Sequence, residues 1–110
     1  FSSRLETLSL AGNQIFGSIP TGIENLASFQ IINIWGNQFT GNIPMDIGKL
    51  QKLQILRFSD NKLSGNIPSS LGNLSLLTHL FLNRNYLEGS IPSSLGKCQN
   101  LQSLSLAVNN

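Results

Sequence analysis

Few side chains in this sequence are of the types that carry out catalysis, and their spacing does not bring them together. His79 is the only histidine, and no serine, cysteine or carboxylate is spaced from it as in a catalytic triad or a metal site. We therefore expect His79 to make surface contacts. A catalytic role, the alternative, would lack partner residues.

The acidic residues do not form a pattern of paired acid and base catalysis. The chain has five of them, at Glu6, Glu24, Asp46, Asp60 and Glu88. Only Glu24 and Asp46 fall at similar places in the repeat described below, on its return segment. A glycosidase needs two carboxylates that face one cleft, which this arrangement does not offer.

The single cysteine and the glycines have structural explanations. Cys98 takes the position at which other repeats have Leu50 and Leu74, so we expect a small buried side chain and not a reactive thiol. Four glycines recur in register with Ile-Pro pairs, which predicts turns and not a phosphate-binding loop. The sequence therefore predicts no enzyme, no metal and no cofactor.

One short motif could carry a modification. Asn73-Leu74-Ser75 is the only acceptor sequence for N-glycosylation, although such a triplet also arises easily from the repeat. It lies on the return segment, so a glycan on Asn73 would point outward without disturbing the stacked coils. Asn73 is a candidate glycosylation site in an extracellular protein.

The elements that must position all these side chains are coils of a repeat 24 residues long. A shift of the chain by one period aligns three apolar columns and one asparagine column. The first two columns contain Leu5, Phe29, Leu53, Leu77 and Leu101, then Leu8, Ile32, Leu56, Leu80 and Leu104. The third column and the asparagine column contain Leu10, Ile34, Phe58, Leu82 and Leu106, then Asn13, Asn37, Asn61, Asn85 and Asn109.

Each column has a physical role within one coil. Apolar residues two apart, such as Leu8 and Leu10, predict a short strand with one buried face. The asparagine suits the turn that follows and can bond the neighbouring coil, which would give a buried ladder. The glycine and Ile-Pro positions predict a second turn. Leu71 and Leu74, three residues apart, then predict a short helix or 3₁₀ turn across the back.

The full period, Leu-x-x-Leu-x-Leu-x-x-Asn-x-Leu-x-Gly-x-Ile-Pro-x-x-Leu-Gly-x-Leu, is best displayed from Leu53 to Leu74. It resembles the plant-specific class of leucine-rich repeats, which occurs in the extracellular parts of plant receptor-like kinases and receptor-like proteins and in secreted polygalacturonase inhibitors. The resemblance implies an α/β repeat solenoid. Its right-handed superhelix would have short parallel strands on the concave face and 3₁₀, short helical or irregular return segments.

We expect a single domain over residues 1–110, with about 4.5 repeats that start near Leu5, Phe29, Leu53, Leu77 and Leu101. Members of the class usually carry caps with paired cysteines, which one cysteine cannot supply. The chain is therefore expected to be a fragment without caps. Its ends would stack on flanking coils or on other copies of the chain.

The outward positions between the fixed columns are free to encode a partner. They form four rows across the coils. The first two rows are Thr7, Ile31, Ile55, His79 and Ser103, then Ser9, Asn33, Arg57, Phe81 and Ser105. The other two rows are Ala11, Trp35, Ser59, Asn83 and Ala107, then Gly12, Gly36, Asp60, Arg84 and Val108.

The middle three coils carry the side chains typical of binding surfaces. Exposed aromatic residues beside arginine are common in hot spots. We therefore predict ligand contacts on the concave face from Ile31, Asn33, Trp35, Ile55, Arg57, Asp60, His79, Phe81, Asn83 and Arg84. The alternative for Ile31 and Ile55 is that they pair across strands as ordinary β-formers.

Composition narrows the class of partner. The net charge is +2 and the basic residues form no run, so no nucleic-acid partner is expected. A membrane would be reached only through a transmembrane segment outside this sequence. The resemblance implies a non-catalytic module in the extracellular ligand-sensing domain of a plant receptor, with a peptide or protein ligand and a possible co-receptor. A secreted inhibitor of a pathogen cell-wall enzyme, or spacer coils without a site, are the alternatives.

Overall fold

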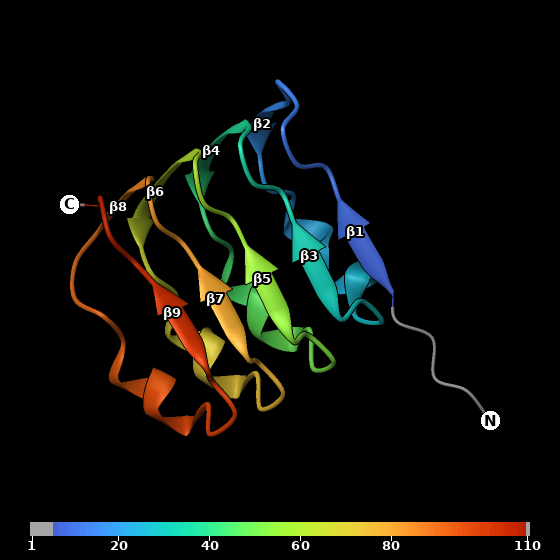
Figure 1. Ribbon diagram of the computed structural model, residues 1–110, viewed down its shortest axis with the longest axis vertical. Helices are drawn as coiled ribbons and strands as arrows, with labels where there is room; N and C mark the ends of the chain where they lie inside the picture. The colour runs from blue at the N-terminus through green and yellow to red at the C-terminus, as the bar shows by residue number, and fades with distance from the viewer. Residues whose placement is uncertain (1–5, 110) are drawn as a thin grey trace.

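The computed structural model describes residues 6–109, apart from the side chains of Thr21 and Glu24. Leu5 and the predicted proximity of the Glu24 side chain to Asp46 therefore lie outside the described part. The coils stack side by side into a body with extents of 43 × 31 × 23 Å. Two parallel sheets and a row of 3₁₀ helices run along this stack (Figure 1). The chain is an α/β repeat solenoid, as predicted.

The first sheet takes one strand from each coil. Its order is β1 (Thr7–Ser9), β3 (Ile31–Asn33), β5 (Ile55–Arg57), β7 (His79–Phe81) and β9 (Ser103–Ser105). We number coils 1 to 5 after these strands. The central residues pair in register, so Ile32, Leu56 and Leu80 stack in the core and are buried. Leu104 belongs to the same column but is exposed, because no coil of the described chain packs over it.

A second parallel sheet was not predicted. It contains β2 (Phe16–Ser18), β4 (Gln38–Asn42), β6 (Lys62–Asn66) and β8 (Tyr86–Glu88), in that order. The turn predicted at the glycine column is therefore wrong in coils 1 to 3, since Gly17, Gly41 and Gly65 lie inside strands, whereas Gly89 is a bend directly after β8. Gly65 has a φ of 78°, and a Cβ there would also collide with the Asn42 side chain of the preceding coil. Glycine is thus favoured for its backbone conformation, while the contact with the exposed Asn42 side chain could be relieved by a rotamer change.

The return segments are 3₁₀ helices, as predicted. They are η1 (Thr21–Leu26), η2 (Met45–Lys49), η3 (Ser69–Asn73) and η4 (Ser93–Lys97), and each follows the proline of an Ile-Pro pair. Leu71 and Leu74 are fully buried. The Ser94 hydroxyl donates to the Ser69 carbonyl of the preceding coil at 2.6 Å, which ties the back of the stack together.

The predicted asparagine ladder is present in the middle coils. The Asn61 Nδ2 group donates to the Ile34 carbonyl of the preceding coil at 3.0 Å and to the Phe58 carbonyl of its own coil at 3.1 Å. Asn61 Oδ1 accepts the amide of Phe39 at 3.1 Å. Asn37 and Asn85 are buried and bonded in the same way. Asn13 departs from the prediction, because it is exposed and donates only to carbonyls of its own coil.

Cys98 packs as predicted. Its side chain is buried, and its thiol donates a weak hydrogen bond to the Leu71 carbonyl of the preceding coil at 3.4 Å. Burial raises the pKa of the Cys98 thiol, because the thiolate would lose its hydration. The burial of Cys98 and the raised pKa of its thiol both favour a structural role over a reactive thiol.

Candidate functional site

The predicted ligand residues share one surface, which we call the strand face. It consists of the outward side chains of the first sheet and of the residues between each strand and the ladder asparagine. Ile31, Ile55 and His79 lie side by side in register, and so do Asn33, Arg57 and Phe81. The other four predicted residues follow the strands in coils 2 to 4, and they are Trp35, Asp60, Asn83 and Arg84. Their contact with a ligand stays a prediction.

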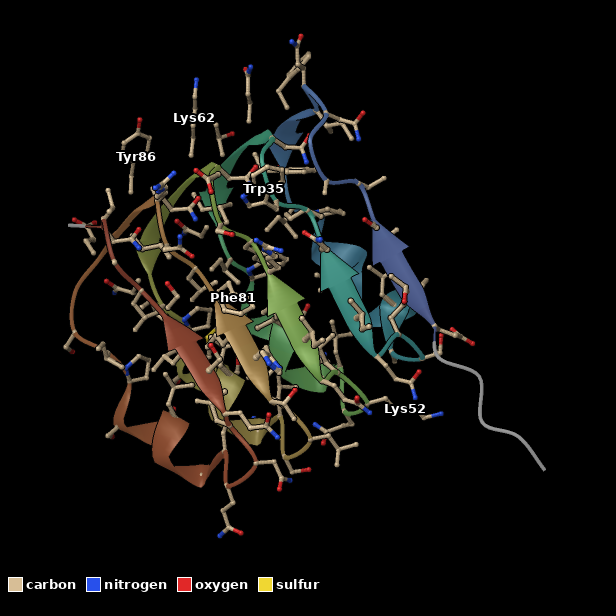
Figure 2. The ribbon with its side chains drawn as sticks, in the orientation of Figure 1. Trp35, Lys52, Lys62, Phe81 and Tyr86 are labelled. Atoms are coloured by element: carbon tan, nitrogen blue, oxygen red, sulfur yellow. The ribbon has the colours of Figure 1, made fainter. Side chains whose placement is uncertain are left out.

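An arginine stacked between two aromatic rings occupies the middle of this face. The Arg57 guanidinium carbon lies 5.7 Å from the centroid of the Trp35 ring and 5.6 Å from that of Phe81. Figure 2 shows both aromatic side chains on the side of the first sheet that faces the viewer. Stacking favours the cation and restricts its rotamers, yet leaves the N–H groups at its edge able to donate. A rigid, amphipathic surface results.

Asp60 fixes the position of the indole. Its Oδ2 accepts a hydrogen bond from Trp35 Nε1 at 2.8 Å, and its Oδ1 lies 3.5 Å from Arg84 Nη1. The Trp35 amide also donates to Asn33 Oδ1 at 3.0 Å. The ion pair is largely exposed and contributes little to stability, so its main effect is to orient the three side chains.

The backbone at these charged residues is in a conformation that favours glycine. Asp60 has a φ of 58° and Arg84 a φ of 61°, at the row where coils 1 and 2 have Gly12 and Gly36. A non-glycine residue in this left-handed region costs about 1–2 kcal/mol. Val108 adopts the same conformation in coil 5, with a φ of 60°, so a non-glycine residue at this row is not by itself a sign of function. What distinguishes Asp60 and Arg84 is that their side chains contact each other and that Asp60 also contacts Trp35.

Replacement of Asp60 by glycine separates the cost of its left-handed backbone from the contribution of its side-chain bond to Trp35. We expect Asp60→Gly to change the free energy of unfolding by less than about 1 kcal/mol, because relief of the left-handed conformation offsets the lost hydrogen bond. The fluorescence emission of Trp35, the only tryptophan, should shift as the indole loses its partner. Val108, with a φ of 60°, is the control. Val108→Gly should stabilise the chain without altering emission, and unchanged emission in Asp60→Gly would contradict the bridge.

The remaining predicted residues are half-buried. His79 Nδ1 lies 2.8 Å from Thr78 Oγ1, and its ring centroid is 5.9 Å from that of Phe81. Ile31 pairs directly with Ile55. Cross-strand packing, the alternative explanation, is therefore enough to account for these two isoleucines.

The predicted outward position of Ser59 is wrong. Its relative exposure is 2%, whereas Trp35 in the same row is 39% exposed. Ser59 is a small side chain between the larger Trp35 and Asn83 of the neighbouring coils, and the indole reaches past it to Asp60. The hydrogen bond from Trp35 to Asp60 therefore passes over Ser59, which is buried. The alternation of side chains along one strand does not predict this arrangement.

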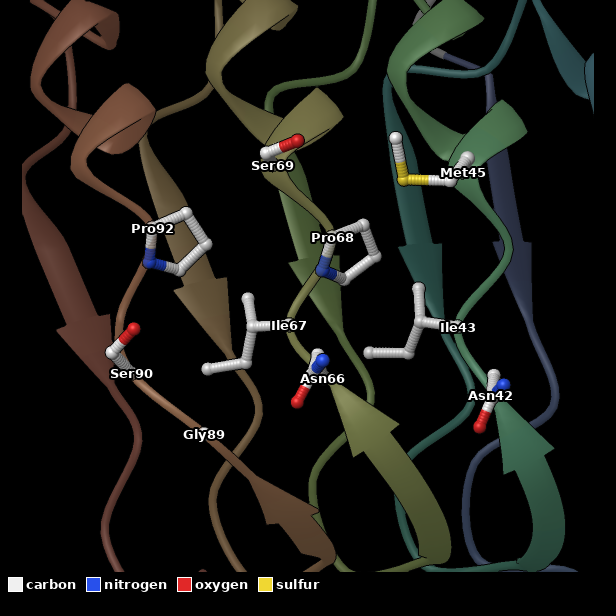
Figure 3. Close-up of a pocket in the computed structure, with 10 residues that line it drawn as sticks. All are labelled: Asn42, Ile43, Met45, Asn66, Ile67, Pro68, Ser69, Gly89, Ser90 and Pro92. Carbon is white, nitrogen blue, oxygen red and sulfur yellow. The ribbon is translucent and has the colours of Figure 1, made fainter.

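A groove on the flank of coils 2 to 4 was not predicted. It has a volume of about 610 Å³ and lies where the second sheet leads into the 3₁₀ helices (Figure 3). Its lining residues are Asn42, Ile43, Met45, Asn66, Ile67, Pro68, Ser69, Gly89, Ser90 and Pro92. They include no charged side chain, and half of them belong to the fixed glycine and Ile-Pro columns. The strand face, with its charged and aromatic groups, is the stronger candidate site.

Among the His, Cys, Asp and Glu side chains that the structure describes, which do not include Glu24, no three gather closely enough to hold a metal ion. Residues 6–109 contain no helix that is both long and apolar enough to span a bilayer.

Comparison with known proteins identifies the family. The model of the Leucine Rich Repeat family matches residues 4–26, 28–50, 52–74 and 76–98. A search of curated protein sequences finds no match.

Several solved structures of plant receptor ectodomains are similar. The Arabidopsis thaliana receptor kinase GASSHO1/SCHENGEN3, in complex with CASPARIAN STRIP INTEGRITY FACTOR 2, is 44% identical, with a TM-score of 0.93 over 96% of this chain and 13% of that chain. The Arabidopsis receptor kinase HAESA, in complex with the peptide hormone IDA and the co-receptor SERK1, is 39% identical, with a TM-score of 0.93 over 97% and 18%.

A third neighbour, the BIR3–SERK2 complex from Arabidopsis thaliana, is 39% identical, with a TM-score of 0.89 over 94% of this chain and 55% of that chain. The chain thus spans between 13% and 55% of these three structures. The four family matches, in register with the four complete coils, establish that the chain belongs to the leucine-rich repeat family.

Proposed function

We propose that the strand face binds an extended peptide or protein segment, without catalysis, as part of the extracellular ligand-sensing domain of a plant receptor-like kinase or receptor-like protein. The observation that carries this proposal is the stack of Arg57 between Trp35 and Phe81, with Asp60 holding the indole. Contacts among these groups restrict their rotamers without a ligand, which would reduce the side-chain entropy lost on binding. The complex of HAESA with the peptide hormone IDA and the co-receptor SERK1 supports this class of partner.

A library of random linear peptides displayed on phage tests the proposal. Peptides selected on the 110-residue chain should bind Trp35→Ala, Arg57→Ala and Phe81→Ala at least about 10-fold more weakly, the usual effect of truncating a hot-spot residue. Calorimetry gives the affinities, and circular dichroism confirms that each variant is folded.

Lys52→Ala is the matched control, since Lys52 is exposed and lies away from the labelled aromatic residues of the strand face (Figure 2). It should leave the affinity unchanged within about twofold. Equal affinity of all four variants would contradict the proposal and favour spacer coils without a site of their own.

We also propose that Asn73 is glycosylated when the chain is secreted. Asn73 is exposed at the end of η3, and Ser75 of the same acceptor sequence is exposed as well. Peptide mapping of material from a plant secretory host should find a glycan on Asn73, and Ser75→Ala should abolish it. Asn100, an exposed asparagine outside any acceptor sequence, provides the internal control. An unmodified Asn73 would contradict this proposal.

A further inference from the structure

His79 is the only histidine of the chain and lies on the strand face in β7. Its Nδ1 is 2.8 Å from Thr78 Oγ1, and that hydroxyl oxygen is 3.0 Å from the backbone carbonyl oxygen of Gln54 in the preceding coil. The three groups form one short chain of hydrogen bonds. The directions of these bonds determine which ring nitrogen carries the proton.

The hydroxyl of Thr78 has one proton to donate. A carbonyl oxygen can only accept, so the contact with Gln54 is a hydrogen bond only if the hydroxyl donates to it. Thr78 Oγ1 must then accept from His79 Nδ1. The opposite direction would point the hydroxyl proton at Nδ1 and leave the two oxygens facing each other at 3.0 Å, although the Gln54 carbonyl would still accept the backbone amides of Thr78 at 2.7 Å and His79 at 3.1 Å. With the hydroxyl donating to Gln54, the neutral ring has its proton on Nδ1 and a lone pair on Nε2.

The second ring nitrogen of His79 reaches solvent. None of the described residues forms a hydrogen bond with Nε2, and within residues 6–109 no buried side-chain nitrogen or oxygen lacks a partner. Its lone pair is therefore accessible. The surrounding groups on the face differ from it. Arg57 and Arg84 can only donate, Asp60 is engaged with Trp35 and Arg84, and Asn33 Oδ1 accepts the Trp35 amide. The Asn83 amide can present either its oxygen or its NH₂ group, so it does not select a donor in the way that a fixed Nε2 lone pair does.

We propose that His79 determines the specificity of the strand face by offering a fixed hydrogen-bond acceptor at Nε2. A bound peptide would place an N–H or O–H group there, whereas a carbonyl or carboxylate at the same place would meet a lone pair. Thr78 and the Gln54 carbonyl act as positioning groups, since they hold the ring in this tautomer. The inference rests on the proposed function for its ligand, but the tautomer itself can be tested without one.

The tautomer is measured by long-range ¹H–¹⁵N correlation of the single histidine in the 110-residue chain, at a pH where the ring is neutral. The proton should be on Nδ1. Thr78→Val, which removes the accepting oxygen, should give a mixture of both tautomers, and Thr78→Ser should keep the proton on Nδ1. A proton on Nε2 in the unsubstituted chain would overturn the assignment, whether or not the variants fold.

The acceptor role is measured with the peptides selected from the library. His79→Gln can place a carbonyl oxygen near the site of Nε2, whereas His79→Asn has only an amide near the site of Nδ1. We expect His79→Gln to retain affinity within about twofold and His79→Asn to bind about fivefold more weakly, the effect of one hydrogen bond. Equal affinities would overturn the acceptor role. A failure to select any peptide would instead count against the proposed function, while the tautomer result would stand.

Discussion

Replacement of Asn61 by leucine is expected to lower the free energy of unfolding by about 2–4 kcal/mol, because the Phe39 amide loses its acceptor and the larger side chain overpacks a buried position. The carbonyls of Ile34, Phe58 and Ser59 would lose one donor, but each keeps a second one, from Asn37, Asn85 and the Gly36 amide in that order. Leucine branches at Cγ like asparagine but is larger, so the loss would combine the missing hydrogen bonds with overpacking at a buried position.

Asn13 provides the matched control for this substitution. It occupies the same repeat position but is exposed and donates only to the carbonyls of Leu10 and Ala11. The Leu10 carbonyl also accepts from Asn37 and so remains satisfied. Asn13→Leu should cost less than about 1 kcal/mol in urea denaturation followed by circular dichroism. Similar losses of stability for Asn61→Leu and Asn13→Leu would show that the hydrogen bonds from Asn61 to the preceding coil contribute little.

Gly72→Ala is expected to destabilise the chain by about 2–3 kcal/mol, the upper range for overpacking at a close contact. A Cβ at Gly72 would lie 2.7 Å from Ser94 Cβ in the next coil and would collide with the Ser94 carbonyl oxygen. These are backbone and Cβ atoms that a rotamer change cannot move. Coils 3 and 4 would have to separate at η3 and η4, which would also strain the bond from Ser94 to Ser69.

Gly96→Ala tests the same position of the repeat without the clash. A Cβ at Gly96 would meet no atom within 4 Å. Alanine there should be neutral or stabilise by about 0.4–1 kcal/mol, because it restricts the unfolded chain. If thermal and urea unfolding show that Gly72→Ala lowers stability and Gly96→Ala raises it, the effect comes from the contact of residue 72 with Ser94 in the next coil. A loss of stability in Gly96→Ala as large as in Gly72→Ala would contradict this explanation.

The fold could be predicted where one coil carries the signal by itself. The spacing of Leu8 and Leu10, and of Leu71 and Leu74, predicts the first strand and the 3₁₀ helix correctly. The second sheet could not be predicted in this way. In β4 only Phe39 is buried, and a glycine with positive φ lies in the strand, so the local sequence is typical of a turn. Its strands pair with the next coil, and only the stack makes them a sheet.

The site could be predicted as a set of outward positions but not as a set of contacts. Alternation along each strand placed Arg57 and Phe81 on the same face. The bond from Trp35 to Asp60, and the burial of Ser59 beneath that row, depend on rotamers that cross from one coil to the next. No spacing rule contains this information. One sign of these contacts was present in the sequence. The row that has Gly12 and Gly36 in coils 1 and 2 has Asp60 and Arg84 in coils 3 and 4, although the backbone there favours glycine.

The bridge from Trp35 through Asp60 to Arg84 also has a mechanical meaning. It joins three successive coils on one side of the solenoid, while the asparagine ladder and the 3₁₀ helices join the same coils elsewhere. Bending that opens the strand face would lengthen this bridge, and bending that closes it would press Trp35 and Phe81 against Arg57. The bridge therefore adds a weak restraint on the bending of coils 2 to 4, carried by side chains that a ligand would have to contact.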